Sequence, residues 1–170
     1  MDAGVINFAV YENGSELLGI AQVAFGSMAS KKITVNGAGI PGDVDIPVPG
    51  HRDAMTVSIN FIDAPEAEYK LRSTRVHDLD LRAAHEQYDP TVGAMQVVAY
   101  KHLLRVIPIS QDGGSLTPAT AQGVSHEYTV LSREDFIDGK RVMKYDPLNF
   151  QDIDADGVDH LAAVRTALGK

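Results

Sequence analysis

Cysteine and tryptophan are both absent from this chain of 170 residues. Without cysteine, the protein can have no thiol nucleophile, no thiolate metal site and no disulfide. Without tryptophan, and with no interleaving of basic and aromatic residues, it lacks the stacking surface on which single-stranded nucleic acids bind. These absences exclude several classes of enzyme and binding protein before any motif is considered.

Long apolar runs are missing as well. No stretch reaches the roughly 18 apolar residues that a membrane-spanning helix needs. The first residues, MDAGVINFAVYENG, lack the basic and apolar regions of a signal peptide. We therefore expect a soluble protein that is made in the cytoplasm and has no membrane anchoring.

Positive charge is scarce, because 15 Lys and Arg residues stand against 23 Asp and Glu residues, for a net charge of −8. Tight binding of nucleic acid requires a basic face that displaces counterions from phosphates, and this composition argues against such a face. The length fits one domain, residues 1–170, which can bury about 70% of its unfolded surface without a metal or a disulfide. We expect no cofactor.

The pattern of apolar residues is mostly that of β-strands. Residues 5–11 are β-branched and aromatic, and Asn13-Gly14 after them favours a tight hairpin into residues 17–25. In residues 55–61, MTVSINF, apolar and polar residues alternate, which predicts a strand with one buried face.

Further strands follow in the second half of the chain. Alternation in residues 77–84 predicts another strand with one buried face. Residues 94–110, rich in Val, Ile, Leu and Tyr, predict a strand of unusual length. Residues 125–150 predict a final hairpin with Asp138-Gly139 at its tip.

Two short helices complete the prediction. Pro65 suits the first position of a helical turn or two within residues 64–75. A stripe of apolar residues predicts an amphipathic helix over residues 157–168, with Asp156 as its N-cap and Gly169 as the left-handed residue that ends it. The fold class is therefore mainly β (α+β): an antiparallel β-sandwich or rolled sheet with a short central helix and a C-terminal helix.

Residues 31–51 are rich in glycine and proline and predict a long loop or an irregular protruding hairpin, because three prolines cannot lie in a central strand. Gly37, Gly39 and Gly42 match the G-x-G-x-x-G spacing of dinucleotide-binding turns. Such a turn must open a helix, and the residues that follow, DVDIPVPG, cannot form one. The sequence predicts no nucleotide site.

Residues 152–157, DIDADG, fill positions 1, 3, 5 and 6 of an EF-hand calcium loop. Position 12 of that loop requires a bidentate Glu and is Ala163 here, and position 8, usually apolar, is Asp159. The aspartates are better interpreted as an acidic turn that favours the positive end of the C-terminal helix dipole.

No pair of residues predicts catalysis. His77 and His85 would lie about 26 Å apart along one strand, so they could not share a metal ion. Ser125 and His126 are neighbours and would point to opposite faces of a strand, and no G-x-S-x-G motif occurs. We expect a protein that is not an enzyme and holds no metal.

Several stretches together resemble the major tail tube protein of contractile-tailed bacteriophages and phage-tail-like bacteriocins. These stretches occur in the family's order and span nearly the whole chain. They read INFAVYENGSELLGIAQVAF, ITVNGAGIPGDVDIPV, HDLDLRAAHEQYDP, YKHLLRVIPIS, FIDGKRVMKYDPLNF and DGVDHLAAVRTALGK, the last being the most specific.

The resemblance implies a structural subunit of the inner tail tube of a contractile injection machine. Such proteins form hexameric rings whose sheets join into one β-barrel, and the rings stack into a hollow tube that conducts DNA or punctures the target envelope. The implied partners are further copies of the chain and the tail sheath, baseplate and tail terminator proteins, with genomic DNA passing through without sequence-specific binding. Assembly in the bacterial host cytoplasm would yield a virion or a tailocin particle.

The resemblance also implies roles for individual residues. The segment from Ile33 to Val48 would reach the neighbouring ring, the alternative being a mobile surface loop. The ring-stacking residues would be Thr34, Asn36, Gly37, Gly39, Ile40, Gly42, Asp43 and Asp45. Residues 55–61, 77–84 and 94–107 would form the barrel wall, with Met55, Val57, Ile59, Leu79, Leu81, Val97 and Leu104. A lumen that takes part of the −8 charge of each subunit would let DNA slide without sticking.

Two other classes of function are open from the sequence. One is a small β-sandwich module that binds sugar or calcium, for which clustered exposed aromatic residues are typical; the Phe and Tyr residues here mostly alternate with polar ones. The other is an enzyme on a β scaffold. Within the tube class, the tube of type VI secretion is similar in shape, but the closing signature favours the phage family.

Overall fold

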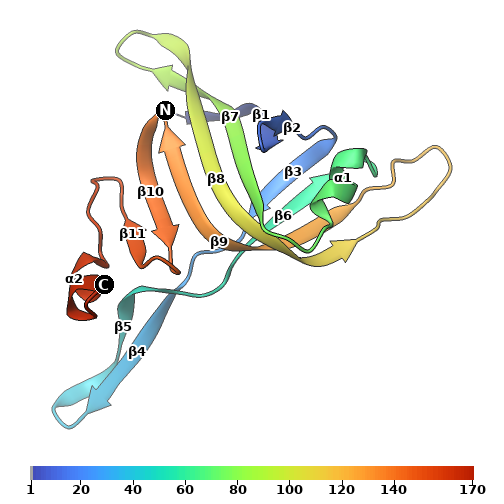
Figure 1. Ribbon diagram of the computed structural model, residues 1–170. Helices are drawn as coiled ribbons and strands as arrows, with labels where there is room; N and C mark the ends of the chain where they lie inside the picture. The colour runs from blue at the N-terminus through green and yellow to red at the C-terminus, as the bar shows by residue number, and fades with distance from the viewer. Residues whose placement is uncertain (1) are drawn as a thin grey trace.

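The computed structural model describes residues 2–170, and most of them lie in antiparallel β-strands (Figure 1). The strands are β1 (Asp2–Glu12), β2 (Ser15–Glu16), β3 (Ile20–Phe25), β4 (Ser30–Gly37), β5 (Ile40–Arg52), β6 (Met55–Phe61), β7 (His77–Asp89), β8 (Ala94–Asp112), β9 (Ser125–Ile137), β10 (Lys140–Asp146) and β11 (Gln151–Ile153). The helices are α1 (Glu66–Leu71) and α2 (Ala162–Ala167). The mainly β class with two short helices is confirmed.

Nine strands form one sheet that rolls over its own core. Its path runs β11-β10-β9-β8-β7-β1-β2, and β6 and β3 branch from β9. β9 has two partners along one edge, because residues 133–137 pair with β10 and residues 125–130 pair with β6. β3 extends that branch by pairing with β6. The branch packs against β1, β7 and β8 through a shared core, so the sheet is rolled and is not a sandwich of two separate sheets.

The core lies between the branch and the long strands. β6 buries every second residue, as its alternating sequence predicts, and Val57 and Ile59 are completely inaccessible. Leu79 of β7 and Leu104 of β8 are directly paired and belong to the same buried cluster, which Leu71 of α1 also joins. One face of β7 and β8 is therefore covered by the chain itself, and the opposite face is left uncovered.

The long strands follow the predictions closely. β8 contains 19 residues and pairs with all 13 residues of β7. The hairpin between β9 and β10 turns at Asp138 and Gly139, whose φ angles of 47° and 79° are the left-handed pair that a tight hairpin turn requires.

The first predicted hairpin is only partly formed. The chain turns at Asn13 and Gly14 as expected, but β2 is two residues long. Gly19, with φ of 85°, redirects the chain, and β3 then pairs with β6 instead of with β1. The Leu17 N–H still donates to the Val10 carbonyl at 2.8 Å, so the prediction of a hairpin into residues 17–25 is wrong beyond Leu17. Most of the outer edge of β1 is left unpaired.

The C-terminal helix is shorter than predicted, because α2 begins at Ala162 and not at residue 157. Side-chain hydrogen bonds hold the preceding residues in turns. The Asp154 carboxylate accepts the backbone N–H groups of Asp156 and Val158, each at 3.0 Å, and Asp159 accepts that of Leu161 at 3.0 Å. Asp156 is therefore not the N-cap. The helix ends as predicted, before Gly169, whose φ is 69°.

The central helix is confirmed as α1, a single short helix preceded by Pro65, which occupies the N-cap and not the first helical position. It packs on the core side of the rolled sheet, since Glu68 and Leu71 are fully buried. Neither helix in residues 2–170 has the length and apolar character that a membrane crossing would need.

The glycine- and proline-rich segment forms an arm. β4 and β5 make a separate two-stranded sheet that projects away from the rolled sheet (Figure 1). We call residues 30–52 the arm. The irregular protruding hairpin is thus the correct one of the two structures predicted for this segment. Its prolines are tolerated because a two-stranded ribbon has only edge strands, on which a missing N–H group can face solvent.

Candidate assembly surfaces

The arm has an apolar face and a polar face. In the register of β4 and β5, Ile33 lies opposite Ile46 and Val35 opposite Val44. Because side chains alternate along each strand, these four share one side of the ribbon. Ile33, Val44 and Ile46 are 60%, 51% and 51% exposed. An isolated two-stranded hairpin is at best marginally stable in water, so an uncovered apolar face of this kind suits an assembly contact.

The other face of the arm is held by polar contacts. Asp45 accepts hydrogen bonds from the Lys32 ammonium and from the Thr34 hydroxyl, the latter at 2.7 Å. The Lys32 contact first, and then the Thr34 hydroxyl, hold the pKa of Asp45 below its ordinary value. These contacts link the two strands of the ribbon across its solvent side.

All eight ring-stacking residues expected from the sequence lie in the arm and are exposed. Thr34, Asn36 and Asp45 belong to the polar face or its edge, and Gly37, Gly39, Ile40, Gly42 and Asp43 lie at or beside the tip. The apolar face was missed. Its signal in the sequence is the alternation of Ile33 and Val35 with Thr34. The glycines and prolines around these residues obscure that signal, because they are typical of a loop.

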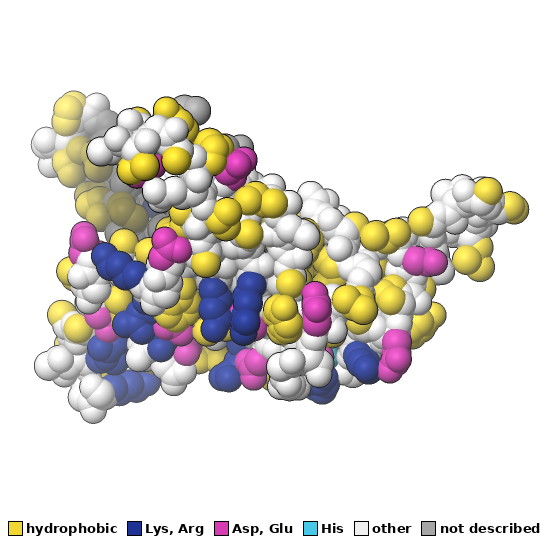
Figure 2. Space-filling model, turned by 90° about the horizontal axis from the view of Figure 1, so that it is seen from above, with side chains coloured by type: hydrophobic (Ala, Val, Ile, Leu, Met, Phe, Trp, Pro, Cys, Tyr) yellow, Lys and Arg dark blue, Asp and Glu magenta, His cyan; other side chains and the backbone are white. Residues whose placement is uncertain are grey.

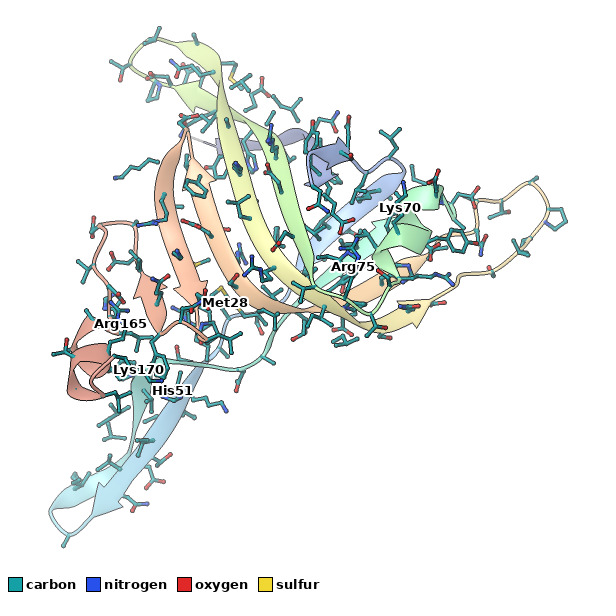
Figure 3. The ribbon with its side chains drawn as sticks, in the orientation of Figure 1. Met28, His51, Lys70, Arg75, Arg165 and Lys170 are labelled. Carbon is teal, nitrogen blue, oxygen red and sulfur yellow. The ribbon has the colours of Figure 1, made fainter. Side chains whose placement is uncertain are left out.

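The root of the arm is clamped by the C-terminal segment. Nη2 of Arg52 lies 3.0 Å and 3.2 Å from the two carboxylate oxygens of Asp152, and the Tyr145 hydroxyl donates to the Gly50 carbonyl at 3.0 Å. Leu161 packs so closely on Gly50 that a Cβ there would overlap it. Arg165, Lys170 and His51 gather at this junction, whereas Lys70 and Arg75 lie across the body beside α1 (Figure 3).

The aspartates that resemble a calcium loop have other partners. Asp152 pairs with Arg52, and Asp159 pairs with Arg165 at 2.6 Å. Asp154 accepts backbone N–H groups and contacts His160 at 2.9 Å. The Val158 N–H contributes most to holding the pKa of Asp154 below its ordinary value. Across residues 2–170, no three His, Asp or Glu side chains are arranged to hold a metal ion.

The expected barrel-wall residues divide into two groups. Met55, Val57, Ile59, Leu79, Leu81 and Leu104 are buried in the core of the subunit, on the covered face of the sheet. Val97 lies on the upper part of β8 and is 68% exposed. The six buried side chains therefore pack inside the subunit, and only Val97 of this group is exposed enough to contact another molecule.

That opposite face, which we call the polar face of the sheet, is formed by β7, β8, β9 and β10. Arg105 donates from Nε to Asp78 at 2.8 Å. Asp80 lies 2.7 Å from Arg82 and 3.6 Å from Lys101. Seen from above, the surface of the molecule shows Lys and Arg side chains interleaved with Asp and Glu, without one basic patch (Figure 2). The charges of this face are thus arranged as pairs.

Two contacts between a histidine and a glutamate are buried beneath α1. The inaccessible His77 lies 2.6 Å from the Glu12 carboxylate through Nδ1 and 2.9 Å from the Ser73 carbonyl through Nε2. His126 contacts Glu68 at 2.7 Å, also without solvent access. These groups join α1 and β1 to the sheet and cannot meet a substrate.

The residue pairs considered for catalysis stay apart. His85 stacks on Tyr100, with ring centroids 3.9 Å apart, away from the cluster of His77. The Ser125 hydroxyl donates to Asn60 at 2.6 Å, while His126 is turned to Glu68. As predicted, Ser125 and His126 do not face each other.

Comparison with known proteins places the chain. The family description of phage tail tube protein FII matches residues 2–169. The chain matches none of the curated proteins. Among solved structures, the sheath/tube terminator of an extracellular contractile injection system, PVC, in the extended state is 8% identical, with a TM-score of 0.52 over 77% of this chain and 94% of that chain.

A sheath-tube complex of such a system, also in the extended state, is 13% identical, with a TM-score of 0.46 over 76% of this chain and 85% of that chain. The likeness to the terminator shows a shared fold. The family match extends almost from end to end and carries the assignment. The chain therefore belongs to the phage tail tube protein FII family and is a structural subunit of the tube of a virion or tail-like particle.

Proposed function

We propose that the chain, as a single tail-tube domain, assembles into homohexameric rings that stack into the inner tube of a contractile tail. The tube conducts DNA or punctures the target envelope, and the subunit acts without catalysis. Its partners are further copies of itself, the tail sheath, the baseplate and the tail terminator. Assembly takes place in the cytoplasm of the bacterial host.

The arm is the observation that carries this proposal. Its apolar face is uncovered in the single subunit, and a short ribbon of this kind requires a partner surface. Its root is clamped by Arg52 and Asp152, so the arm extends in a fixed direction. We propose that the arm stacks one ring on the next, with its tip residues among the contacts.

The unpaired strand edges support closure of a ring. β2 covers only Tyr11 and Glu12 of β1, which leaves most of the edge of β1 open. On the far side of the sheet, β11 covers only Lys144, Tyr145 and Asp146 of β10. Two open edges on opposite sides of one sheet suit a heterologous contact, which closes into a ring and abolishes exposed edges.

Negative-stain electron microscopy of the purified protein across a concentration series tests the proposal. We expect rings and hollow tubes of uniform width with sixfold end views. Deletion of residues 36–45 should leave rings and abolish stacking. If the protein remains featureless at high concentration even when a baseplate is added as a nucleus, the proposal is wrong.

A further inference from the structure

We propose that the polar face of the sheet lines the channel of the tube and is a surface to which DNA does not adhere, because its basic side chains are already neutralised by carboxylates of the same face. This inference rests on the proposed function and adds to it which surface meets the transported polyanion.

The position of this face follows from what covers the sheet. One side of β7, β8 and β9 carries the branch of β3 and β6, together with α1 and the shared core. Within residues 2–170, no further layer covers the polar side. When such sheets close into a ring, the side that bears an extra layer needs the larger circumference and lies outside. The polar face is then left toward the axis.

The polar face carries charges of both signs, with carboxylates in excess. Seven carboxylates alternate with the core-facing residues of the four strands, namely Asp78, Asp80, Glu86, Asp112, Glu127, Glu134 and Asp146. Five basic residues share that side: Arg82, Lys101, Arg105, Arg141 and Lys144. Glu16 and Asp138 at the rim bring the balance to −4, half of the net charge of −8.

Neighbouring strands bring these charges into contact. Arg82 and Lys101 lie directly opposite each other, an arrangement of like charges that is unfavourable by itself. Asp80 lies between them and contacts both. Arg105 pairs with Asp78, and Arg141 contacts Glu134 at 3.1 Å. Four of the five basic side chains are thus held by a carboxylate of the same face.

This pairing decides how the face interacts with DNA. Binding of DNA draws its free energy from the release of counterions by cations that reach phosphates. A cation that already has a carboxylate partner must give it up and leave an unpaired carboxylate beside the phosphate. The face therefore suits a moving polyanion.

Binding of a short fluorescent DNA duplex of random sequence to the free subunit tests the charge pattern. The face variant carries Asp78→Asn, Asp80→Asn and Glu134→Gln, which release Arg105, Arg82, Lys101 and Arg141. A matched control carries Asp43→Asn, Asp63→Asn and Asp156→Asn at exposed positions elsewhere. Each variant loses three negative charges, so both have a net charge of −5 in place of −8.

At low salt we expect no binding by the wild type or the control, and measurable binding by the face variant. Its affinity should fall with salt with a log–log slope of about −2 to −4, since each phosphate contact contributes about −0.9. Binding by the wild type, equal binding by the control, or no binding by a folded face variant would overturn the inference. If the triple variant does not fold, Asp78→Asn with Glu134→Gln should give about half that slope.

Cysteine labelling tests the position of the face, with no background because the chain has no native cysteine. Ser132→Cys lies opposite Arg105 on the polar face, and Glu66→Cys lies on α1 as an outer control. In assembled tubes, Ser132→Cys should react with a small maleimide but not with maleimide-coated gold wider than the channel. Reaction of Ser132→Cys in tubes with the gold reagent would overturn the placement.

The two levels of proposal fail separately. The duplex assay uses free subunits, so its result does not depend on assembly. An absence of rings in the microscope would overturn the proposed function and with it the channel placement. Rings that form normally from a wild-type subunit that binds DNA would overturn only the inference about the face.

Discussion

At the scale of single residues, the root of the arm depends on a glycine with two constraints. Gly50 has φ of 68°, in the left-handed region, and a Cβ at this position would overlap the buried Leu161 side chain. Gly139 has a similar φ of 79°, but a Cβ there would meet open space. A substitution at Gly139 therefore adds backbone strain alone, whereas one at Gly50 adds backbone strain and steric overlap with Leu161.

We expect Gly50→Ala to lower the free energy of unfolding by about 2–4 kcal/mol, the sum of left-handed strain and overpacking. Gly139→Ala should lower it by about 1–2 kcal/mol, from strain alone. Urea unfolding of both variants measures the difference. Equal losses at the two positions would show that Leu161 moves aside without cost and that the root is not tightly packed.

Asp135 gives the subunit a defined response to acid. Burial by itself raises the pKa of this carboxyl, but hydrogen bonds from His102 and Arg133 outweigh it and hold the pKa below the ordinary 3.8. A lowered pKa in the folded state contributes stability above the unfolded pKa, and that stability is lost as the pH falls toward the folded pKa.

Asp135→Asn should therefore lower the free energy of unfolding at pH 7 by about 1–3 kcal/mol, because it removes the charged partner of His102 and Arg133. The difference from the wild type should shrink as the pH falls below about 3.8, where the carboxyl of the unfolded chain takes up a proton while the folded one is still ionised. Chemical unfolding at pH 7 and pH 3 measures both values. A difference that stays constant between these pH values would refute the assignment.

At the scale of elements, the two faces of the arm allow a direct test of which one binds. Val44→Thr with Ile46→Thr keeps β-branched side chains but makes the apolar face polar. At about 1 kcal/mol for each side chain, this change should raise the subunit concentration needed for stacking roughly thirtyfold. Unfolding of the free subunit should hardly change, because both side chains are half exposed there.

The control for the arm lies on its other face. Thr34→Ala with Asn36→Ala alters residues expected from the sequence to stack the rings, and it should raise that concentration less. Turbidity and electron microscopy of the two variants at matched concentrations give the comparison. If only the polar-face variant weakens stacking, the apolar face is not the contact.

Elements in which apolar and polar residues alternate regularly were predictable from the sequence. Elements whose bounds or partners depend on residues distant in the chain were not. β6 was expected at residues 55–61 and has those bounds, because its alternation continues unbroken into the core. The arm strands were hidden, since proline and glycine interrupt the alternation of Ile33, Val35, Val44 and Ile46. α2 begins late because Asp154 and Asp159 bind backbone N–H groups that a longer helix would have used.

The candidate surfaces were less accessible to sequence reasoning. Asp78 and Arg105 are 27 positions apart, and only the register of β7 and β8 makes them partners. The net charge of −8 pointed to an acidic lumen, but it did not show that most basic side chains of the polar face already have a carboxylate partner. The partner of β3 is non-local in the same way, because Gly19 turns the chain away from β1 toward β6.

At the scale of the whole molecule, assembly depends on the open edge of β1. Ile6 is 56% exposed beside this edge, and charged residues on a strand edge oppose pairing with another chain. Ile6→Lys should leave the free subunit folded. It should raise the subunit concentration needed for ring formation at least about tenfold, which corresponds to a loss of about 1.4 kcal/mol per subunit contact. Leu116→Lys, at a site 87% exposed between β8 and β9, adds the same charge away from the edges and should assemble normally. Sedimentation velocity of the two variants separates the outcomes, because ring formation by Ile6→Lys at wild-type concentrations would exclude β1 from the subunit contact.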